Sequence, residues 1–359
     1  MKQLQSLVDL RELAPVDVEL GALLMRRATP MLADVDEARV VAMTGALLSS
    51  ERARGHSCLD LAAVAGRAPW AAAPELRLPD AARWRAILER SRLCGEGGAV
   101  APLVLDGERL YLHRFHQAER RLAAAVRARV ASASPGTPDA ETVALFRRLF
   151  PAARGGEVDW QAVAAAAAMR GRLTVITGGP GTGKTTTVAR ILALLLHQDP
   201  TLRVAVAAPT GKAAARLAES IAASAATLPV DEHLRDRLPR EGRTLHRLLG
   251  YRPWDDAFAH GAECPLAEGA IVVDEASMVD VLMMDALLAA VRSSARVILL
   301  GDQDQLASVE TGYVLGDLCA AAEAGGDLHG AALARWYDAL SGAPLPSSPA
   351  VTPLRDAVV

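Results

Sequence analysis

One eight-residue stretch constrains this chain more than any other feature of its sequence. It reads Gly178-Gly179-Pro180-Gly181-Thr182-Gly183-Lys184-Thr185, after a β-branched run at 173–177 and before apolar residues of helical spacing at 188–194. The full G-x-x-x-x-G-K-T pattern therefore lies between an expected strand and an expected helix, as a phosphate-binding loop requires. Its glycines allow backbone N–H groups to face inward, where the positive end of the helix dipole helps them hold a phosphate chain.

The last residues of this P-loop have separate expected roles. Lys184 adds a point charge toward the β- and γ-phosphates, and the Thr185 hydroxyl is placed to bind a Mg²⁺ ion that bridges them. The alternative is a glycine-rich turn without a ligand, which the complete pattern disfavours. The residues expected to bind the nucleotide are Gly178, Gly179, Pro180, Gly181, Thr182, Gly183, Lys184, Thr185 and Thr186.

Two acids end a second apolar run, Ile271-Val272-Val273. Asp274 at the expected strand end can hold Mg²⁺ through water, and Glu275 can orient and deprotonate an attacking water. The competing interpretation is that these acids only cap a helix that starts at Asp280.

A third apolar run, 297–300, opens into a polar loop that contains Gln305. Parallel α/β sheets gather their ligands at the edge where such loops lie, so Gln305 is placed to sense a γ-phosphate. A structural loop amide is an equally good interpretation of the spacing.

Two further loops resemble binding loops for nucleic-acid phosphates. Thr210 and Lys212 follow a strand-like run and precede a helix-like one, without the second glycine of a nucleotide loop, and a helix N-terminus there could bind a phosphate. Thr244 and His246 could supply a second contact, although a lone histidine is more often structural.

These segments together resemble the motifs of superfamily 1 helicases, in the form found in the RecD family, the alpha subunits of exodeoxyribonuclease V. The resemblance is dense from Val158 to Leu318 and weaker before that, chiefly at 109–114. It implies ATP and Mg²⁺ as cofactors, 5′-to-3′ movement on single-stranded DNA, and docking on the beta and gamma subunits. It also implies that Gln161 reads adenine.

Composition limits the class of protein. The 359 residues are 51% hydrophobic and carry 39 Lys and Arg against 42 Asp and Glu, a formal charge of −3, so contact with nucleic acid must be local. No apolar run is long enough to span a bilayer, and the N-terminus lacks the pattern of a signal peptide. We therefore expect a cytoplasmic protein that does not associate with a membrane. Four scattered cysteines predict free thiols.

The expected fold is α/β: a RecA-like P-loop sheet of parallel strands with helices on both faces, preceded by a mostly helical N-terminal domain. Helices are expected at 4–27, 36–50, 80–92 and 115–130, with a hairpin near 103–112. The last helix carries an Arg-rich face that could contact DNA or a partner, but a solvated face is the favoured interpretation; its residues are Arg120, Arg121, Arg127 and Arg129. The expected domains are residues 1–131 for partner docking, 132–157 as linker and connecting helix, 158–325 as the ATPase, and 326–359 as a tail.

Members of the resembled family carry a second RecA-like domain, so the tail is expected to be the start of such a domain in a truncated product. The expected function is the ATP-binding and hydrolysing half of a helicase subunit in recombinational double-strand break repair. One alternative is a truncated nucleotide-binding scaffold without helicase turnover. Another is a P-loop ATPase unrelated to DNA.

Overall fold

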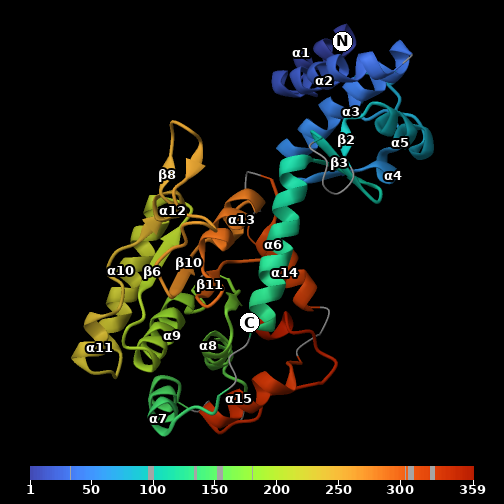
Figure 1. The fold of residues 1–359 in the computed structure, drawn as a ribbon. Coiled ribbons are helices and arrows are strands. Elements are labelled where there is room, and N and C mark those ends of the chain that lie inside the picture. The colour runs from blue at the N-terminus through green and yellow to red at the C-terminus, as the bar shows by residue number, and fades with distance from the viewer. Residues whose placement is uncertain are drawn as a thin grey trace. The chain divides into compact units, whose positions relative to one another are not determined.

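The computed structural model describes residues 1–359 apart from Ala33, 96–100, 133–135, 152–156, Pro180, Asp304, 306–310 and 324–327. Its contacts divide the chain into two units (Figure 1). The first unit is Met1–Arg120 with Ser308–Gly312, and the second is Arg121–Ala307 with Tyr313–Val359.

The first unit begins with helices whose close packing depends on glycine. A Cβ atom at Gly21 of α2 would lie 2.4 Å from the Ala42 carbonyl oxygen of α3, so these two helices approach closely only because Gly21 has no side chain. The helices are α1 (Lys2–Asp9), α2 (Pro15–Ala28), η1 (Thr29–Met31), α3 (Val35–Ala53), α4 (Leu61–Val64) and α5 (Ala81–Arg90).

The helical spacing predicted over 4–27 is divided between two helices, because α1 ends at Asp9 and α2 begins at Pro15. Proline fits the first turn of a helix, where its missing N–H is not needed, and it cannot continue a helix from the preceding turn.

The predicted hairpin near 103–112 is confirmed, with a turn at Gly107, whose φ is +59°. It belongs to a four-stranded sheet of order β1-β4-β3-β2. The strands are β1 (Cys58–Asp60), β2 (Cys94–Gly95), β3 (Leu103–Asp106) and β4 (Arg109–Leu112). The outer strands are only two and three residues long, which is too short for an alternating pattern to reveal.

Helix α6 (His113–Ala131) confirms the expected solvated arginine face at Arg120, Arg121 and Arg127, which are exposed, and corrects it at Arg129. Arg129 is 5% exposed, and its guanidinium donates to the Leu288 and Val291 carbonyl oxygens at 2.9 and 2.8 Å. Arg121 forms an ion pair with Asp285. Arg129 therefore binds the end of helix α13 (Val281–Ala290), where carbonyls at a helix C-terminus are natural partners for a cation, whereas Asp285, the partner of Arg121, lies within that helix.

The second unit alternates strands with helices. Its helices are α7 (Ala140–Leu149), α8 (Trp160–Arg170), α9 (Lys184–Gln198), α10 (Gly211–Thr227), α11 (Glu232–Asp236), α12 (Leu245–Leu249), η2 (Ala276–Met278), α13, α14 (Val314–Glu323), α15 (Ala331–Ser341) and η3 (Arg355–Ala357). Its strands are β5 (Leu173–Ile176), β6 (Val204–Ala208), β7 (Arg243–Thr244), β8 (Tyr251–Arg252), β9 (Ala257–Phe258), β10 (Ala270–Val273) and β11 (Arg296–Leu300).

Five of these strands form a parallel sheet of order β5-β11-β10-β6-β7. Val272 and Ile298 belong to the core cluster that contains α8 and α9, whereas their neighbours Ile271 and Leu299 are equally buried outside that cluster. Successive side chains of a strand point to opposite faces, so both faces of the sheet are covered. The predicted α/β class is confirmed.

Parallel pairing brings the carboxyl ends of all five strands to one edge of the sheet, and this positions the site. Strand β5 pairs with β11 along one side. Along its other side Val358 pairs with Val175, and the Val359 carbonyl accepts from the Thr177 N–H at 2.8 Å. The edge strand that leads into the P-loop therefore has partners on both sides.

Other predictions from composition can be compared with the structure directly. All four cysteines are free thiols, as predicted. In the described part of the chain, every helix is too short or too polar to cross a bilayer. The predicted domain limits at 131, 157 and 325 stay predictions, because the division into two units reflects contacts and does not test which segments fold alone.

Candidate nucleotide and nucleic-acid site

The P-loop connects β5 to α9, as its sequence predicts. Gly181 and Gly183 have φ of +79° and +84°, a region that glycine enters without steric cost. A Cβ atom at Gly183 would also lie 2.7 Å from Nε2 of Gln161, so two separate constraints require glycine there. Gly183 is the N-cap of α9, and Thr185 and Thr186 lie in the first turn of that helix. Pro180 lies outside the described residues.

Lys184 contacts its own loop. Its Nζ atom donates to the Gly178 carbonyl and, at 3.0 Å, to the Gly179 carbonyl, and Thr182 Oγ1 donates to the same Gly179 oxygen at 3.0 Å. A phosphate chain would have to compete with these carbonyls for the ammonium group. The lysine is thus held at the place where the loop would receive a phosphate.

Gln161 lies against the P-loop rather than on a free helix surface. Its Nε2 donates to the Thr182 carbonyl at 3.1 Å, and its Oε1 accepts from Arg190 at 3.3 Å. Arg190 also lies 5.2 Å from the centroid of the Phe150 ring. The amide is therefore fixed beside the nucleotide loop, and its expected role in reading adenine stays a prediction.

Asp274 ends β10, next to the P-loop edge of the sheet. Burial raises the pKa of its carboxyl above the ordinary aspartate value, and the Glu275 N–H and the charges of Lys184 and Arg216 oppose this rise. The Glu275 N–H donates to Asp274 Oδ1 at 2.9 Å. A partly buried carboxylate with this shift is a good ligand for a cation, because a bound cation removes the cost of its charge.

Glu275 has a strained backbone. Its φ and ψ are +52° and +40°, the left-handed region, which costs a residue with a side chain about 1–2 kcal/mol. The interpretation that the two acids only cap the next helix is not needed, since Asp280 caps α13 itself through the N–H groups of Leu282 and Met283. Backbone strain at a residue whose side chain caps no helix in the described part of the chain is typical of functional sites.

Gln305 is joined to the acid-bearing segment. Its Oε1 accepts from the Ser277 hydroxyl at 3.3 Å, and its N–H donates to the Asp302 carbonyl at 3.3 Å. Ser277 is buried and follows Glu275 by two residues. The loops after β10 and β11 are therefore linked by a hydrogen bond between side chains. Such a link is needed if Glu275 and Gln305 are to contact the same phosphate.

Thr210 and Thr244 are N-caps. Thr210 Oγ1 accepts from the Ala213 N–H at 3.2 Å at the start of α10, and Thr244 Oγ1 accepts from the Arg247 N–H at 3.1 Å at the start of α12. Strand β7 pairs with β6 so that Thr244 lies opposite Ala208, which brings the two caps to neighbouring positions. Both hydroxyls stabilise helices whether or not they also bind DNA.

Lys212 is exposed in the first turn of α10. Arg216, one helical turn later, is also exposed and is close enough to Asp274 to affect the pKa of its carboxyl. Arg216 is not among the residues predicted from the sequence. The four-residue spacing from Lys212, which puts both side chains on one face of a helix, could have revealed it.

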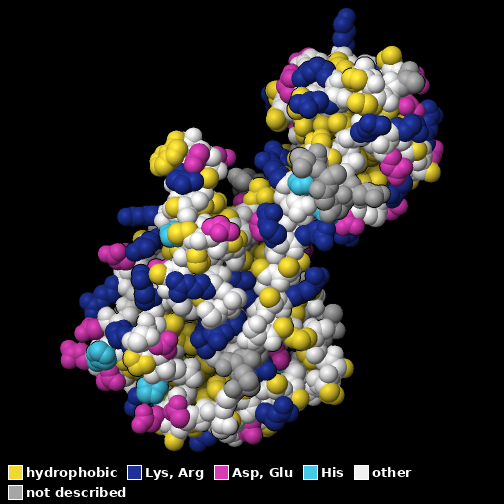
Figure 2. Space-filling model, in the orientation of Figure 1, with side chains coloured by type: hydrophobic (Ala, Val, Ile, Leu, Met, Phe, Trp, Pro, Cys, Tyr) yellow, Lys and Arg dark blue, Asp and Glu magenta, His cyan; other side chains and the backbone are white. Residues whose placement is uncertain are grey.

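His246 packs with aromatic rings. Its ring centroid lies 5.3 Å from Tyr251 and 6.1 Å from Phe258, the two ends of the β8–β9 hairpin. Trp254 in the turn of this hairpin is 81% exposed, and the hydrophobic tip is visible in Figure 2. The packing supports the structural interpretation of His246, and a DNA contact stays a prediction.

The donors at this edge fit a P-loop magnesium site. Among the described residues no three His, Cys, Asp or Glu side chains gather as a metal cluster. Mg²⁺ at a P-loop needs fewer protein ligands, because phosphates and waters fill most of its coordination shell. The Thr185 hydroxyl and the Asp274 carboxylate supply the oxygen types that it requires.

Two family models match separate parts of the chain. The N-terminal domain of RecBCD enzyme subunit RecD matches residues 9–111, and an AAA domain matches residues 160–311. The second match spans the P-loop, both acids and Gln305. The AAA match implies nucleotide binding.

Curated relatives are similar over most of the chain. The RecBCD enzyme subunit RecD of Mycolicibacterium smegmatis is 44% identical over 315 residues, which are 85% of this chain and 52% of that protein. The same subunit of Mycobacterium tuberculosis is 43% identical, over 80% of this chain and 48% of that protein. The ATP-dependent RecD2 DNA helicase of Deinococcus radiodurans is 38% identical, over 62% of this chain and 28% of that protein. The chain spans about half the length of the first two relatives.

Proposed function

Because the chain belongs to the RecD family, we propose that it is the ATP-binding and hydrolysing motor part of a 5′-to-3′ DNA helicase subunit of exodeoxyribonuclease V, acting in recombinational double-strand break repair. The observation that carries this proposal is the single sheet edge where the P-loop, the two acids and Gln305 lie. The two helix N-termini capped by Thr210 and Thr244 follow β6 and β7, the next strands along the same edge.

At this edge the loop glycines and the N-terminal amides of α9 would bind the phosphates of ATP, with Lys184 at the β- and γ-phosphates. Thr185 and Asp274 would hold Mg²⁺, which neutralises charge on the same phosphates. Glu275 would accept a proton from the attacking water, and Gln305 would contact the γ-phosphate. Gln161 would contact adenine.

The proposed nucleic-acid partner is single-stranded DNA, bound at Thr210, Lys212, Thr244 and His246. Such binding is local, because Figure 2 shows Lys and Arg mixed with Asp and Glu over the visible face of both units. The beta and gamma subunits of exodeoxyribonuclease V are the proposed protein partners, with the N-terminal unit as the docking part. A cytoplasmic location belongs to the same proposal.

The test is ATP hydrolysis by the purified chain with and without single-stranded DNA, with nucleotide binding measured on the same sample. We expect MgATP binding and an increase of hydrolysis on adding DNA. Binding without any hydrolysis, even with the other subunits present, would replace the proposal with a nucleotide-binding scaffold. Hydrolysis that DNA never stimulates would instead indicate an ATPase unrelated to DNA.

A further inference from the structure

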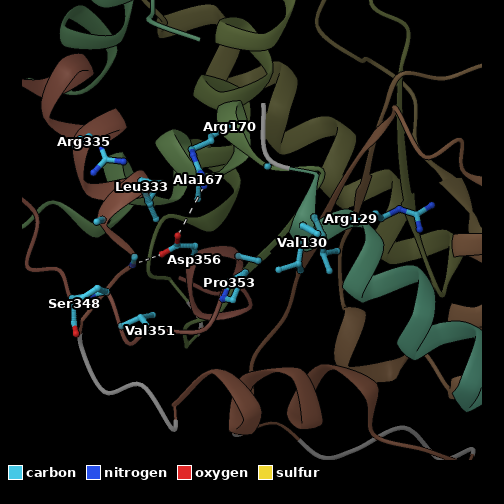
Figure 3. Close-up of a pocket in the computed structure, with 18 residues that line it drawn as sticks. Arg129, Val130, Ala167, Arg170, Leu333, Arg335, Ser348, Val351, Pro353 and Asp356 are labelled. Atoms are coloured by element: carbon cyan, nitrogen blue, oxygen red, sulfur yellow. Dashed lines mark hydrogen bonds and ion pairs between the residues drawn. The ribbon is translucent and has the colours of Figure 1, made fainter. Parts of the chain in front are cut away.

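A cavity of about 390 Å³ lies in the second unit (Figure 3), and its lining includes none of the residues of the nucleotide edge. Its wall includes Arg170 and Gly171, at the amino end of β5, whereas the P-loop follows the carboxyl end of that strand. The first turn of α15 and the segment 348–357 complete much of the wall. The cavity is therefore separate from the residues that would bind ATP.

The wall carries an excess of positive charge. Arg335 on α15 is exposed and makes no ion pair with another described residue, and Arg170 has only a long contact of 3.9 Å to Asp356. The guanidinium of Arg129, the third arginine of the wall, is already bonded to carbonyls of α13. Asp356 is the one carboxylate among the described wall residues, so two guanidinium groups remain available to an anion.

The start of α15 adds backbone donors to the same wall. Residues 330–333 all line the cavity, and the N-cap, Gly330, provides no side chain to accept from the first N–H groups of the helix. The Gly330 N–H donates to Asp356 Oδ1 at 2.7 Å. Asp356 thus occupies the position that an anion takes at a helix N-terminus.

A buried histidine next to this wall lacks hydrogen-bond partners. His329, which directly precedes Gly330, is 0% exposed, and neither ring nitrogen has a hydrogen-bond partner among the described residues. Its Nδ1 faces Asp356 Oδ1 at 3.6 Å, too far for a hydrogen bond. Buried polar groups normally have partners, so the region behind Asp356 keeps an unpaired polar ring, although His329 does not itself line the cavity.

We propose that this cavity binds the phosphate group of a small molecule. Arg170, Arg335 and the free N–H groups of α15 would hold its oxygens, and Asp356 would compete with it as an internal anion. Guanidinium forks match phosphate oxygens in pairs, and a helix N-terminus favours the same charge. The volume is within the range of small-molecule pockets, about 300–1,000 Å³, so there is room for more than the phosphate alone.

The test is calorimetric titration of the chain with inorganic phosphate and with pyrophosphate. Every protein in the series also carries Lys184→Ala, which is expected to weaken phosphate binding at the P-loop equally in all of them, so that differences within the series report on the cavity. Replacing both Arg170 and Arg335 by glutamine is expected to weaken phosphate binding at least about tenfold, the value of one lost charge-assisted bond. Asp356→Asn is expected to strengthen binding several-fold, because it removes the competing charge but keeps an acceptor for the Gly330 N–H.

Arg148→Gln is the matched control, because Arg148 is exposed on α7, lies outside the cavity wall and carries the same charge. Unchanged affinity in the arginine variant, or an equal loss in the control, would overturn the proposal. Tighter binding of acetate than of phosphate would also overturn it, in favour of an acidic peptide. If the double variant does not fold, judged by circular dichroism, Arg335→Gln alone decides, since that side chain is exposed.

Discussion

The polar residues in two parts of one sheet edge differ in backbone geometry and burial. On the nucleotide side, after β5, β10 and β11, Lys184 is bonded to loop carbonyls, Glu275 has a left-handed backbone and Asp274 is a carboxyl whose charged form is disfavoured. On the cap side, after β6 and β7, Thr210 and Thr244 hold helix starts in ordinary geometry.

On the nucleotide side the geometry serves ligand binding, whereas on the cap side it serves the stability of the fold. Strain and burial on the nucleotide side cost folding free energy, and they become useful only when a ligand is bound. A cap contributes to folding whatever the ligand. We therefore expect substitutions on the nucleotide side to change activity more than stability, and substitutions on the cap side to change stability first.

The largest expected effect is that of Glu275→Gln. The amide keeps the size of the side chain but cannot accept a proton, so DNA-stimulated hydrolysis should fall by about 10²–10⁴-fold while nucleotide binding is retained. Hydrolysis rates and nucleotide affinity on one preparation provide the measurement.

Glu275→Gly extends this comparison to stability. Glycine relieves the left-handed strain, so the variant should unfold no more easily than the parent protein in urea and should hydrolyse as little as Glu275→Gln. Surviving hydrolysis in Glu275→Gln would refute the role of Glu275 as the proton acceptor. A clear loss of stability in Glu275→Gly would contradict the strain assigned to its backbone.

Lys184→Ala should weaken MgATP binding by about 10- to 150-fold, because it deletes a charge-assisted contact worth about 1.5–3 kcal/mol. Its melting temperature without nucleotide should stay close to that of the parent protein. Fluorescent-nucleotide titration and thermal unfolding measure the two quantities. Near-normal binding in the folded variant would refute the phosphate site.

Thr244→Ala should lower the stability of the fold and leave nucleotide binding nearly unchanged. Loss of an N-cap costs about 1 kcal/mol, which corresponds to roughly 2–4 °C in melting temperature for a protein part of this size. Thr244→Ser keeps the hydroxyl and is the control, and Thr210 offers the same pair of variants. If the alanine variants melt like the parent protein, the caps do not carry the stability that their geometry indicates.

Asp274→Asn should raise stability without nucleotide at neutral pH. The pKa of Asp274 is raised in the folded state, so the protonated form stabilises the fold below the ordinary aspartate value of about 3.9, and this stability is lost as pH rises through the folded pKa. The advantage of the neutral asparagine should therefore shrink as pH falls from 7 toward 4.5. Urea unfolding at both values measures it, and a constant or growing advantage would contradict the assigned direction.

The smallest expected effect is that of Lys212→Ala on DNA affinity. One lost phosphate contact lowers the salt dependence of single-strand binding by roughly 0.7 in slope, evenly across sequences. Titrations at several salt concentrations measure the slope. An unchanged slope would leave Lys212 as an exposed lysine with no contact to DNA.

Much of the nucleotide side was predictable because each motif is local. Gly183 needs a positive φ and Asp274 ends an apolar strand, and both properties follow from residues within one short segment. Arg129 was predicted wrongly for the opposite reason. Its partners are carbonyls of α13, about 160 residues away in sequence, and no local pattern reveals them.

The α/β class, the P-loop between strand and helix, and the two acids at a strand end follow from the order of residues alone, because they depend on spacing along the chain. The contacts of Gln161 with the P-loop, of Ser277 with Gln305, and the neighbouring caps Thr210 and Thr244 are visible only in the folded chain. Strand order and pairing decide which loops meet at an edge, and those depend on the packing of the whole sheet.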